Sequence, residues 1–125
     1  MEKRYLWFTA TTIPNYEQKI AKDLKAIKLN RNIEEIKEII IPMQEYTTPK
    51  GLVKEKPKVP NYFYIKIEVD EDNQPPTWVW HLIRNTKGCI GLLQRDGYML
   101  GMEDFELKEE LRITDEDIAA MAEKL

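Results

Sequence analysis

The chain has 125 residues, of which 42% are hydrophobic and 33% are charged; this balance is typical of a globular domain and excludes a disordered chain. No apolar run approaches the ~20 residues that cross a membrane as a helix, and the first residues lack the long apolar segment of a secretory signal peptide. Cys89 is the only cysteine, so an internal disulfide is excluded, and no His/Cys cluster offers a zinc site; these features predict a cytoplasmic protein without a membrane partner.

The formal net charge is −3, but the two halves of the chain differ. Residues 1–66 carry 13 Lys/Arg and 8 Asp/Glu, whereas residues 67–125 carry 6 and 14. This distribution is compatible with ordinary solvated surface, or with a basic half that contacts the phosphates of a nucleic acid. A sequence pI near 5.3 argues against a dedicated DNA-binding domain.

The first predicted element is a strand over residues 5–11, which are rich in aromatic and β-branched side chains. Pro14 ends it, and Asn15 is predicted to cap the N-terminus of a helix that runs to about residue 29. The helix is predicted because apolar residues recur at helical spacing. These residues are Tyr16, Ile20, Leu24 and Ile27.

A second strand is predicted over residues 36–46, with an edge position or a bulge at Pro42, which cannot donate a hydrogen bond to a neighbouring strand. A turn at residues 47–51 leads into the polar, basic residues 52–58, which are predicted to form a hairpin arm.

The third predicted strand, residues 62–69, alternates strictly between two faces. One face reads as core and consists of Phe63, Ile65, Ile67 and Val69. The other face begins with two tyrosines, Tyr62 and Tyr64, directly after a proline turn and a run of lysines. That aromatic face needs a separate explanation.

The rest of the chain is predicted to hold a helix, a strand, a hairpin and a last helix. These lie at residues 78–85, 89–93, 95–98 and 114–125. The hairpin is predicted from Asp96-Gly97, the preferred pair of a type I′ turn, and the last helix from Thr114, which precedes three acidic residues. Residues 103–112 are compatible with either a surface loop or a short helix.

This order of elements predicts a single α+β domain: an antiparallel four-stranded sheet, ferredoxin-like in its split βαβ pattern, flanked by about three helices. His81 is the only histidine, Cys89 starts an apolar strand, and the glycines stand at separate turns. No catalytic set, metal site or cofactor site is therefore predicted, and the chain is interpreted as a non-enzymatic binding module. A surplus of aromatic residues over the needs of one core face favours a protein interface. They are Trp7, Phe8, Tyr16, Tyr62, Tyr64, Trp78 and Trp80.

Five segments resemble, in the same order, the N-terminal domain of the NusG family of bacterial transcription elongation factors, and the resemblance covers nearly the whole chain. They are WFTATTIPNYEQKIAKDL at 7–24, EIIIPMQEY at 38–46, KVPNYFYIKI at 58–67, WHLIRNTKGCIGLL at 80–93 and ITDEDIAAMAEKL at 113–125.

The family's Phe-Pro-Gly-Tyr hallmark is matched here at Pro60 and Tyr62, whereas Val59 and Asn61 depart from it. Asparagine tolerates positive φ better than most residues, so the turn is expected to be retained. The form with asparagine is also similar to specialised, RfaH-like paralogues, so a general factor and a specialised one both stay open.

The resemblance implies a transcription elongation and antitermination factor that binds the clamp helices of the largest subunit of RNA polymerase and modulates pausing and processivity. It implies a polymerase-binding patch, and a basic rim that faces the polymerase, non-template DNA or RNA. By position, the patch comprises Phe8, Thr11, Val59, Pro60, Tyr62, Tyr64, Leu92 and Leu93. The rim comprises Lys54, Lys56, Lys58, Arg84 and Lys87.

Members of the family usually continue into a β-barrel domain of the KOW type, which nothing in residues 1–125 matches. The chain is therefore expected to be one NusG N-terminal-like domain and a monomer, either a shortened chain or a single-domain paralogue. One alternative is an RNA- or DNA-binding α+β domain that acts through the basic arm without polymerase. Another, a small-molecule sensor, lacks a convergent polar pocket and ranks last.

Overall fold

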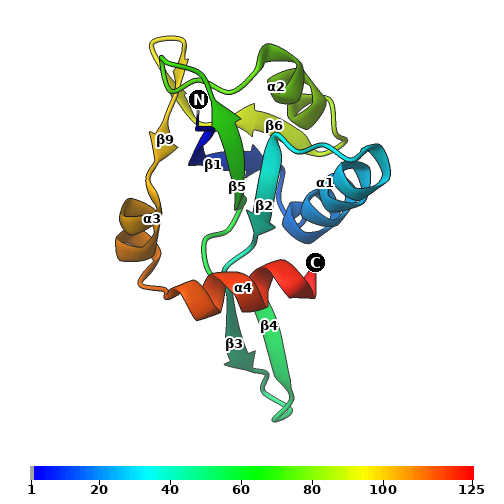
Figure 1. The fold of residues 1–125 in the computed structure, drawn as a ribbon. Coiled ribbons are helices and arrows are strands. Elements are labelled where there is room, and N and C mark those ends of the chain that lie inside the picture. The colour runs from blue at the N-terminus through cyan, green and yellow to red at the C-terminus, as the bar shows by residue number, and fades with distance from the viewer. Residues whose placement is uncertain (1) are drawn as a thin grey trace.

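The strand predicted at the start of the chain becomes the centre of the sheet, because its side chains are apolar on both faces and both faces are covered by helices. The structure is a computed structural model that describes residues 2–125. The main sheet has the strand order β2-β5-β1-β6, and a short fifth strand, β9, also pairs with β1 (Figure 1). The bounds are β1 (Arg4–Thr12), β2 (Ile36–Ile40), β5 (Tyr62–Val69), β6 (Cys89–Leu92) and β9 (Gly101–Met102). All these pairings are antiparallel, so the predicted α+β fold with an antiparallel sheet is confirmed.

Four helices occur in residues 2–125, one more than expected. They are α1 (Glu17–Arg31), α2 (Thr77–Arg84), α3 (Asp104–Leu111) and α4 (Asp115–Lys124). The additional helix is α3, in the segment that the sequence left open between loop and helix. It forms because Glu103 and Glu106 make a reciprocal capping box and because Leu107 and Leu111 find an apolar surface to cover.

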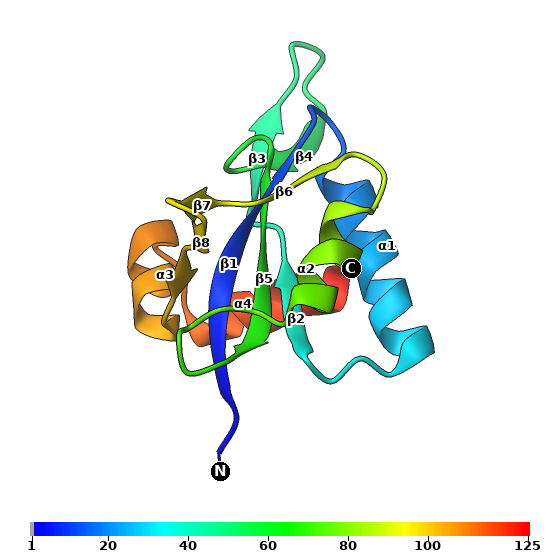
Figure 2. The ribbon, with the colours of Figure 1, turned by 90° about the horizontal axis from the view of Figure 1, so that it is seen from above.

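The sheet has one apolar cluster on each face. The first cluster packs alternate residues of β1 and β5, such as Phe8 and Phe63, against Ile20 and Leu24 of α1 and Val79 of α2. The second cluster joins the opposite face of the same strands to α3 and α4. Its buried members are Trp7, Ile40, Tyr64, Leu107, Leu111 and Ile118. Figure 2 shows α1 and α2 on one side of the strands and α3 on the other.

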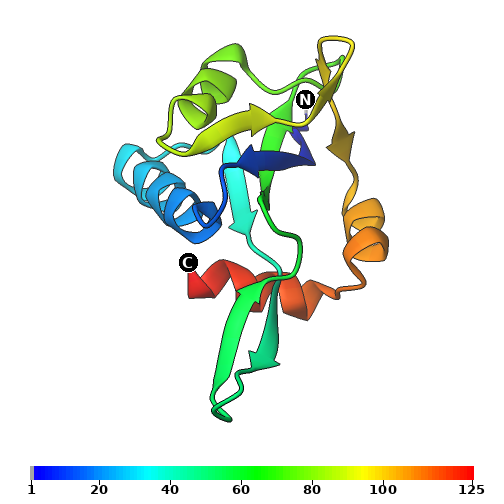
Figure 3. The same cartoon turned by 180° about the vertical axis from the view of Figure 1, so that it is seen from behind.

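The second predicted strand is divided. Strand β2 ends at Ile40, and β3 (Met43–Thr47) leaves the sheet to pair with β4 (Val53–Pro57) in a separate hairpin that projects from the body (Figures 1 and 3). The break falls at Ile41-Pro42, where the carbonyl of Pro42 accepts a hydrogen bond from the Lys58 backbone N–H at 2.7 Å. The predicted hairpin arm is therefore present, paired with the second half of this strand.

Two local predictions have opposite outcomes. Asn15 does not cap α1: the N-cap is Tyr16, and Asn15 lies in the left-handed region with a φ of 70°, where it turns the chain after Pro14. The hairpin at Asp96-Gly97 is confirmed. It joins β7 (Gln94–Arg95) to β8 (Tyr98–Met99), and both turn residues have the positive φ that a type I′ turn requires.

Candidate functional site

The turn before β5 is fixed in place by two other elements. Asn61 has a φ of 70°, as expected for asparagine in place of glycine. Its backbone N–H donates to Glu17 Oε2 at 3.2 Å, and its carbonyl accepts from the Thr12 N–H at 2.8 Å. Glu17 is buried, with 4% of its surface exposed. The end of β1 and the start of α1 thus hold this turn.

Several expected patch residues meet beside this turn. Thr11 and Tyr62 are register partners on neighbouring strands, and Leu93 continues the ladder from β6 by donating its N–H to the Thr9 carbonyl at 2.8 Å. Because successive side chains of a strand point to opposite faces, these three lie on one face of the sheet, whereas Ala10, Phe63 and Leu92 lie on the other face, in the first cluster. Val59 lies against the second cluster and Pro60 is exposed. We call the set Thr11, Val59, Pro60, Tyr62 and Leu93 the open face.

Three expected patch residues are not available on this surface. Phe8 and Leu92 belong to the first cluster on the opposite side of the sheet, with exposed fractions of 0% and 5%. They lie there because Phe8 shares its face with Leu6 and Ala10, which pack toward α1 and α2. Tyr64 does lie on the same face as Tyr62, but it is 4% exposed beneath α3.

Helix α3 is attached to the sheet through a residue that the sequence analysis did not single out, Asp104. Its Oδ1 accepts a hydrogen bond from Trp7 Nε1 at 2.7 Å and lies 2.9 Å from Lys66 Nζ. The Lys66 ammonium also stands over the Trp7 ring, 5.7 Å from its centroid. An acidic residue far along the chain gives no sequence signal that it pairs with a tryptophan and a lysine, so this contact could not be predicted.

Two pKa shifts report the environment under α3. Burial alone would raise the pKa of Asp104, but the hydrogen bonds from Lys66 and Trp7 outweigh it, and the pKa lies below its ordinary value. Burial, followed by the nearby charge of Glu110 and the neighbouring Tyr62, raises the pKa of Tyr64 to about 12. The Tyr64 phenol is therefore neutral at physiological pH.

The expected basic rim is divided between two places. Lys54 and Lys56 are exposed on β4, where Lys56 Nζ stands over the Tyr46 ring at 5.2 Å. Lys58 Nζ instead donates to the Leu111 carbonyl at 2.8 Å, so it fastens the end of α3. The other two rim residues lie at the end of α2 and just after it, away from the hairpin. They are Arg84, over the Trp80 ring at 5.1 Å, and exposed Lys87.

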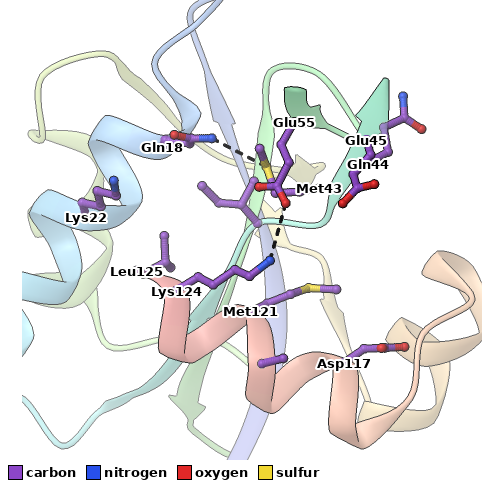
Figure 4. A pocket seen from close by; sticks show the side chains of 12 residues that line it. Gln18, Lys22, Met43, Gln44, Glu45, Glu55, Asp117, Met121, Lys124 and Leu125 are labelled. Atoms are coloured by element: carbon purple, nitrogen blue, oxygen red, sulfur yellow. Dashed lines mark hydrogen bonds and ion pairs between the residues drawn. The ribbon is translucent and has the colours of Figure 1, made fainter. Parts of the chain in front are cut away.

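A groove in the described surface lies elsewhere, between α1, the β3–β4 hairpin and α4. Figure 4 shows this groove of about 520 Å³, with the ion pair between Lys124 and Glu55 (3.6 Å) and the contact from Gln18 to Met43 Sδ (3.8 Å) across it. Its lining mixes both charges with methionines, and it offers no set of polar groups aimed at one point.

Across residues 2–125, no group of three or more His, Cys, Asp and Glu could hold a metal ion, and no helix is long and apolar enough to cross a membrane. Burial raises the pKa of the Cys89 thiol to about 11, and its Sγ lies 3.6 Å from the Thr11 carbonyl as a donor. This half-buried thiol is protonated at physiological pH.

The fold and this surface define the class: an α+β domain whose antiparallel sheet presents an apolar, partly open face beside a projecting basic hairpin. A family model described as transcription termination factor NusG matches residues 5–121. The chain therefore belongs to the NusG family of transcription factors, and the resemblance seen in the sequence is confirmed.

Solved structures agree on the fold. One from a study of domain interaction in Thermotoga maritima NusG superposes with a TM-score of 0.63 at 16% identity. The match covers 88% of this chain and 57% of that one, so the chain spans a little over half the length of this relative. A comparison with curated proteins finds no match.

Proposed function

We propose that this protein is a transcription elongation and antitermination factor domain that binds the clamp helices of the largest RNA polymerase subunit through its open face and thereby modulates pausing and processivity. Residues 1–125 act in this proposal as one N-terminal-type domain of a monomeric protein. The role is one of binding, and it involves no catalytic step.

One observation carries the proposal: aromatic and aliphatic side chains from three separate segments converge around a fixed turn and stay accessible. Tyr62 is half-buried, and Leu93 is 40% exposed. Aromatic anchors at the centre of an interface contribute most of the binding energy when a partner excludes water from them. A pair of packed helices offers a suitable partner, because it presents a narrow apolar stripe with charges on both sides.

The exposed lysines of β4 suit the rim of the same interface. Lys54 and Lys56 lie on a hairpin that extends away from the body, so they can reach phosphates of the non-template DNA or of RNA while the open face contacts protein (Figure 3).

The decisive substitution is Tyr62→Ala, because it removes the aromatic anchor and leaves the turn residues in place. Binding of purified RNA polymerase is expected to weaken by about 2 kcal/mol, or roughly thirty-fold. The matched control is Trp78→Ala, which removes an aromatic side chain that is 49% exposed on α2. Equal binding by the Tyr62 variant and the unaltered protein, with both folded, rules out the open face as the contact.

A second candidate is an RNA- or DNA-binding domain that acts without polymerase. It is favoured by the exposed lysines beside the aromatic Tyr46, but Glu45 and Glu55 face each other in the same hairpin and oppose phosphate binding. Tight, salt-sensitive binding of a nucleic acid by the isolated protein, unaffected by Tyr62→Ala, would favour this candidate.

A further inference from the structure

The open face continues without interruption under α3. On β5 the residue after Tyr62 on the same face is Tyr64, and on the neighbouring strands this face carries Trp7 and Ile40. All three are buried, with exposed fractions of 4%, 0% and 0% for Tyr64, Trp7 and Ile40. We call Trp7, Ile40 and Tyr64 the covered face. Trp7 and Tyr64 would extend the aromatic surface beside the turn if α3 were absent.

The attachments of α3 are few and lie at its two ends and along one stripe. Its buried side chains are Leu107 and Leu111. Asp104 joins its first turn to Trp7 and Lys66, and Lys58 holds its last carbonyl. Lys108 is half-buried and forms an ion pair with Asp115 at the start of α4, 3.2 Å away. The remaining side chains of the helix face solvent, including Phe105, which is 64% exposed.

The helix is weak by itself. It has 8 residues, fewer than an isolated helix needs for stability in water. Glu106, Glu109 and Glu110 repel one another at spacings of three and four residues, and Lys108 is its one basic residue. An element with few buried contacts and internal repulsion opens at a lower free energy than the core does.

The neighbours of α3 are anchored independently. Before it, β9 pairs with β1 through Trp7↔Met102 and Phe8↔Gly101. After it, Arg112 turns the chain with a φ of 56°, and α4 begins with its own capping box at Thr114 and buries Ile118. Detachment of α3 would break the Lys108–Asp115 ion pair and the contacts that Leu107 and Leu111 share with Ile118. The pairing of β9 with β1 and the capping box of α4 would remain, so the chain on either side of α3 keeps its place.

We propose that α3 is a displaceable cover over the polymerase-binding surface: it closes the covered face in the free protein and leaves it when polymerase binds, so that Trp7 and Tyr64 join the open face. This inference rests on the proposed function. Because the partner must displace α3, the closed state lowers the apparent affinity for polymerase, and any change that loosens the helix raises it.

Hydrogen–deuterium exchange of the unaltered protein, alone and bound to RNA polymerase, tests the cover directly. The amides of residues 106–111 are expected to exchange faster in the complex, while the amides of α4 exchange at an unchanged or slower rate. Unchanged or increased protection of α3 in the complex overturns the cover but leaves the proposed function intact. Failure of the unaltered protein to bind polymerase overturns both.

Two loosening variants give an independent readout. Leu107→Ala and Asp104→Ala are each expected to raise the affinity for polymerase several-fold, and the exposed Glu109→Ala on the same helix is the control, with no change. If Leu107→Ala prevents the protein from folding, the affinity of the Asp104→Ala variant alone decides the test. A folded loosening variant that binds polymerase more weakly than the control shows that α3 belongs to the contact surface, which overturns the proposal.

Discussion

At the scale of single residues, Asn61 shows how a departure from a family pattern preserves geometry. Its φ of 70° is strained for most side chains, and its N–H and carbonyl tie β5 to Glu17 and Thr12. The same residue type occupies the left-handed region at Asn15, Asn32 and Asn73. Asparagine thus takes the place that glycine often holds, and the turn could be predicted from the sequence because the chemistry of that residue is local.

Substitution of Asn61 tests this account. Asn61→Ala is expected to lower the free energy of unfolding by about 1–2 kcal/mol, because alanine lacks the short polar side chain that makes positive φ tolerable for asparagine. Asn61→Gly is expected to be nearly neutral, because glycine has no β-carbon and adopts positive φ readily. Chemical denaturation of both variants measures the difference. Equal losses for alanine and glycine would show that the side chain of Asn61, rather than its backbone conformation, stabilises the turn.

Asp104 makes stability depend on pH. Its pKa is lowered in the folded protein, so its contribution is present above the ordinary pKa of an aspartate and is lost as the pH falls through the lowered value. At about pH 7, Asp104→Asn is expected to lower the free energy of unfolding by less than about 1 kcal/mol, since the pair with Lys66 is partly exposed. At about pH 2, where the carboxyl is protonated, the substitution is expected to leave the free energy of unfolding unchanged. Denaturation of both proteins at the two pH values measures this; a cost that persists in acid would contradict an ionic contribution.

At the scale of elements, the β3–β4 hairpin and α3 mark the limit of what the pattern of one chain can predict. Pro42 signals that the strand is interrupted, but it does not say that the second half pairs with residues 53–57 alone instead of continuing at the sheet edge. In α3, the spacing of Leu107 and Leu111 is compatible with a helix, but these two residues do not identify Trp7 and Tyr64 as the surface they cover. Both outcomes depend on long-range pairing.

The hairpin lysines lead to a prediction about nucleic acid. Lys54→Ala with Lys56→Ala is expected to leave stability within about 0.5 kcal/mol, because both side chains are exposed, and to lower the salt dependence of DNA or RNA binding by about one to two units of slope. Lys19→Ala with Lys22→Ala, on α1, is the matched control. Binding titrations at several salt concentrations measure the slope, and identical slopes for both double variants would argue against a hairpin contact.

At the scale of the whole molecule, the sheet separates a structural face from the face that we propose to bind polymerase. The first cluster is closed by the long helix α1 and by α2, whereas the second is closed in part by α3. Strand alternation predicts correctly that β5 has two faces, because one face is aliphatic apart from Phe63. Alternation does not show which face of β1 packs against α1 and α2, because Trp7 and Phe8 are adjacent and equally apolar. For that reason Phe8 could not be excluded from the expected patch on the basis of the sequence.

This separation predicts that the same Leu→Ala substitution lowers the free energy of unfolding by different amounts on the two faces of the sheet. Leu24→Ala, in the first cluster, is expected to lower the global free energy of unfolding by about 3 kcal/mol, since it leaves a cavity in a region that opens only when the protein unfolds. Leu107→Ala is expected to cost less globally and to speed exchange mainly in α3. Leu29→Ala, 66% exposed on α1, is the matched control and is expected to be neutral. Equal global costs for Leu24 and Leu107 would contradict the separation.

The division of the strand at Pro42 has an evolutionary consequence. Among residues 2–125, β3 and β4 form a sheet of their own, so insertions, deletions or new charges near Gly51 alter no register in the main sheet. Selection can therefore vary the length and sequence of the hairpin tip without a loss of foldability. A lineage can thus diversify the length and the charge of the tip while inheriting the same scaffold.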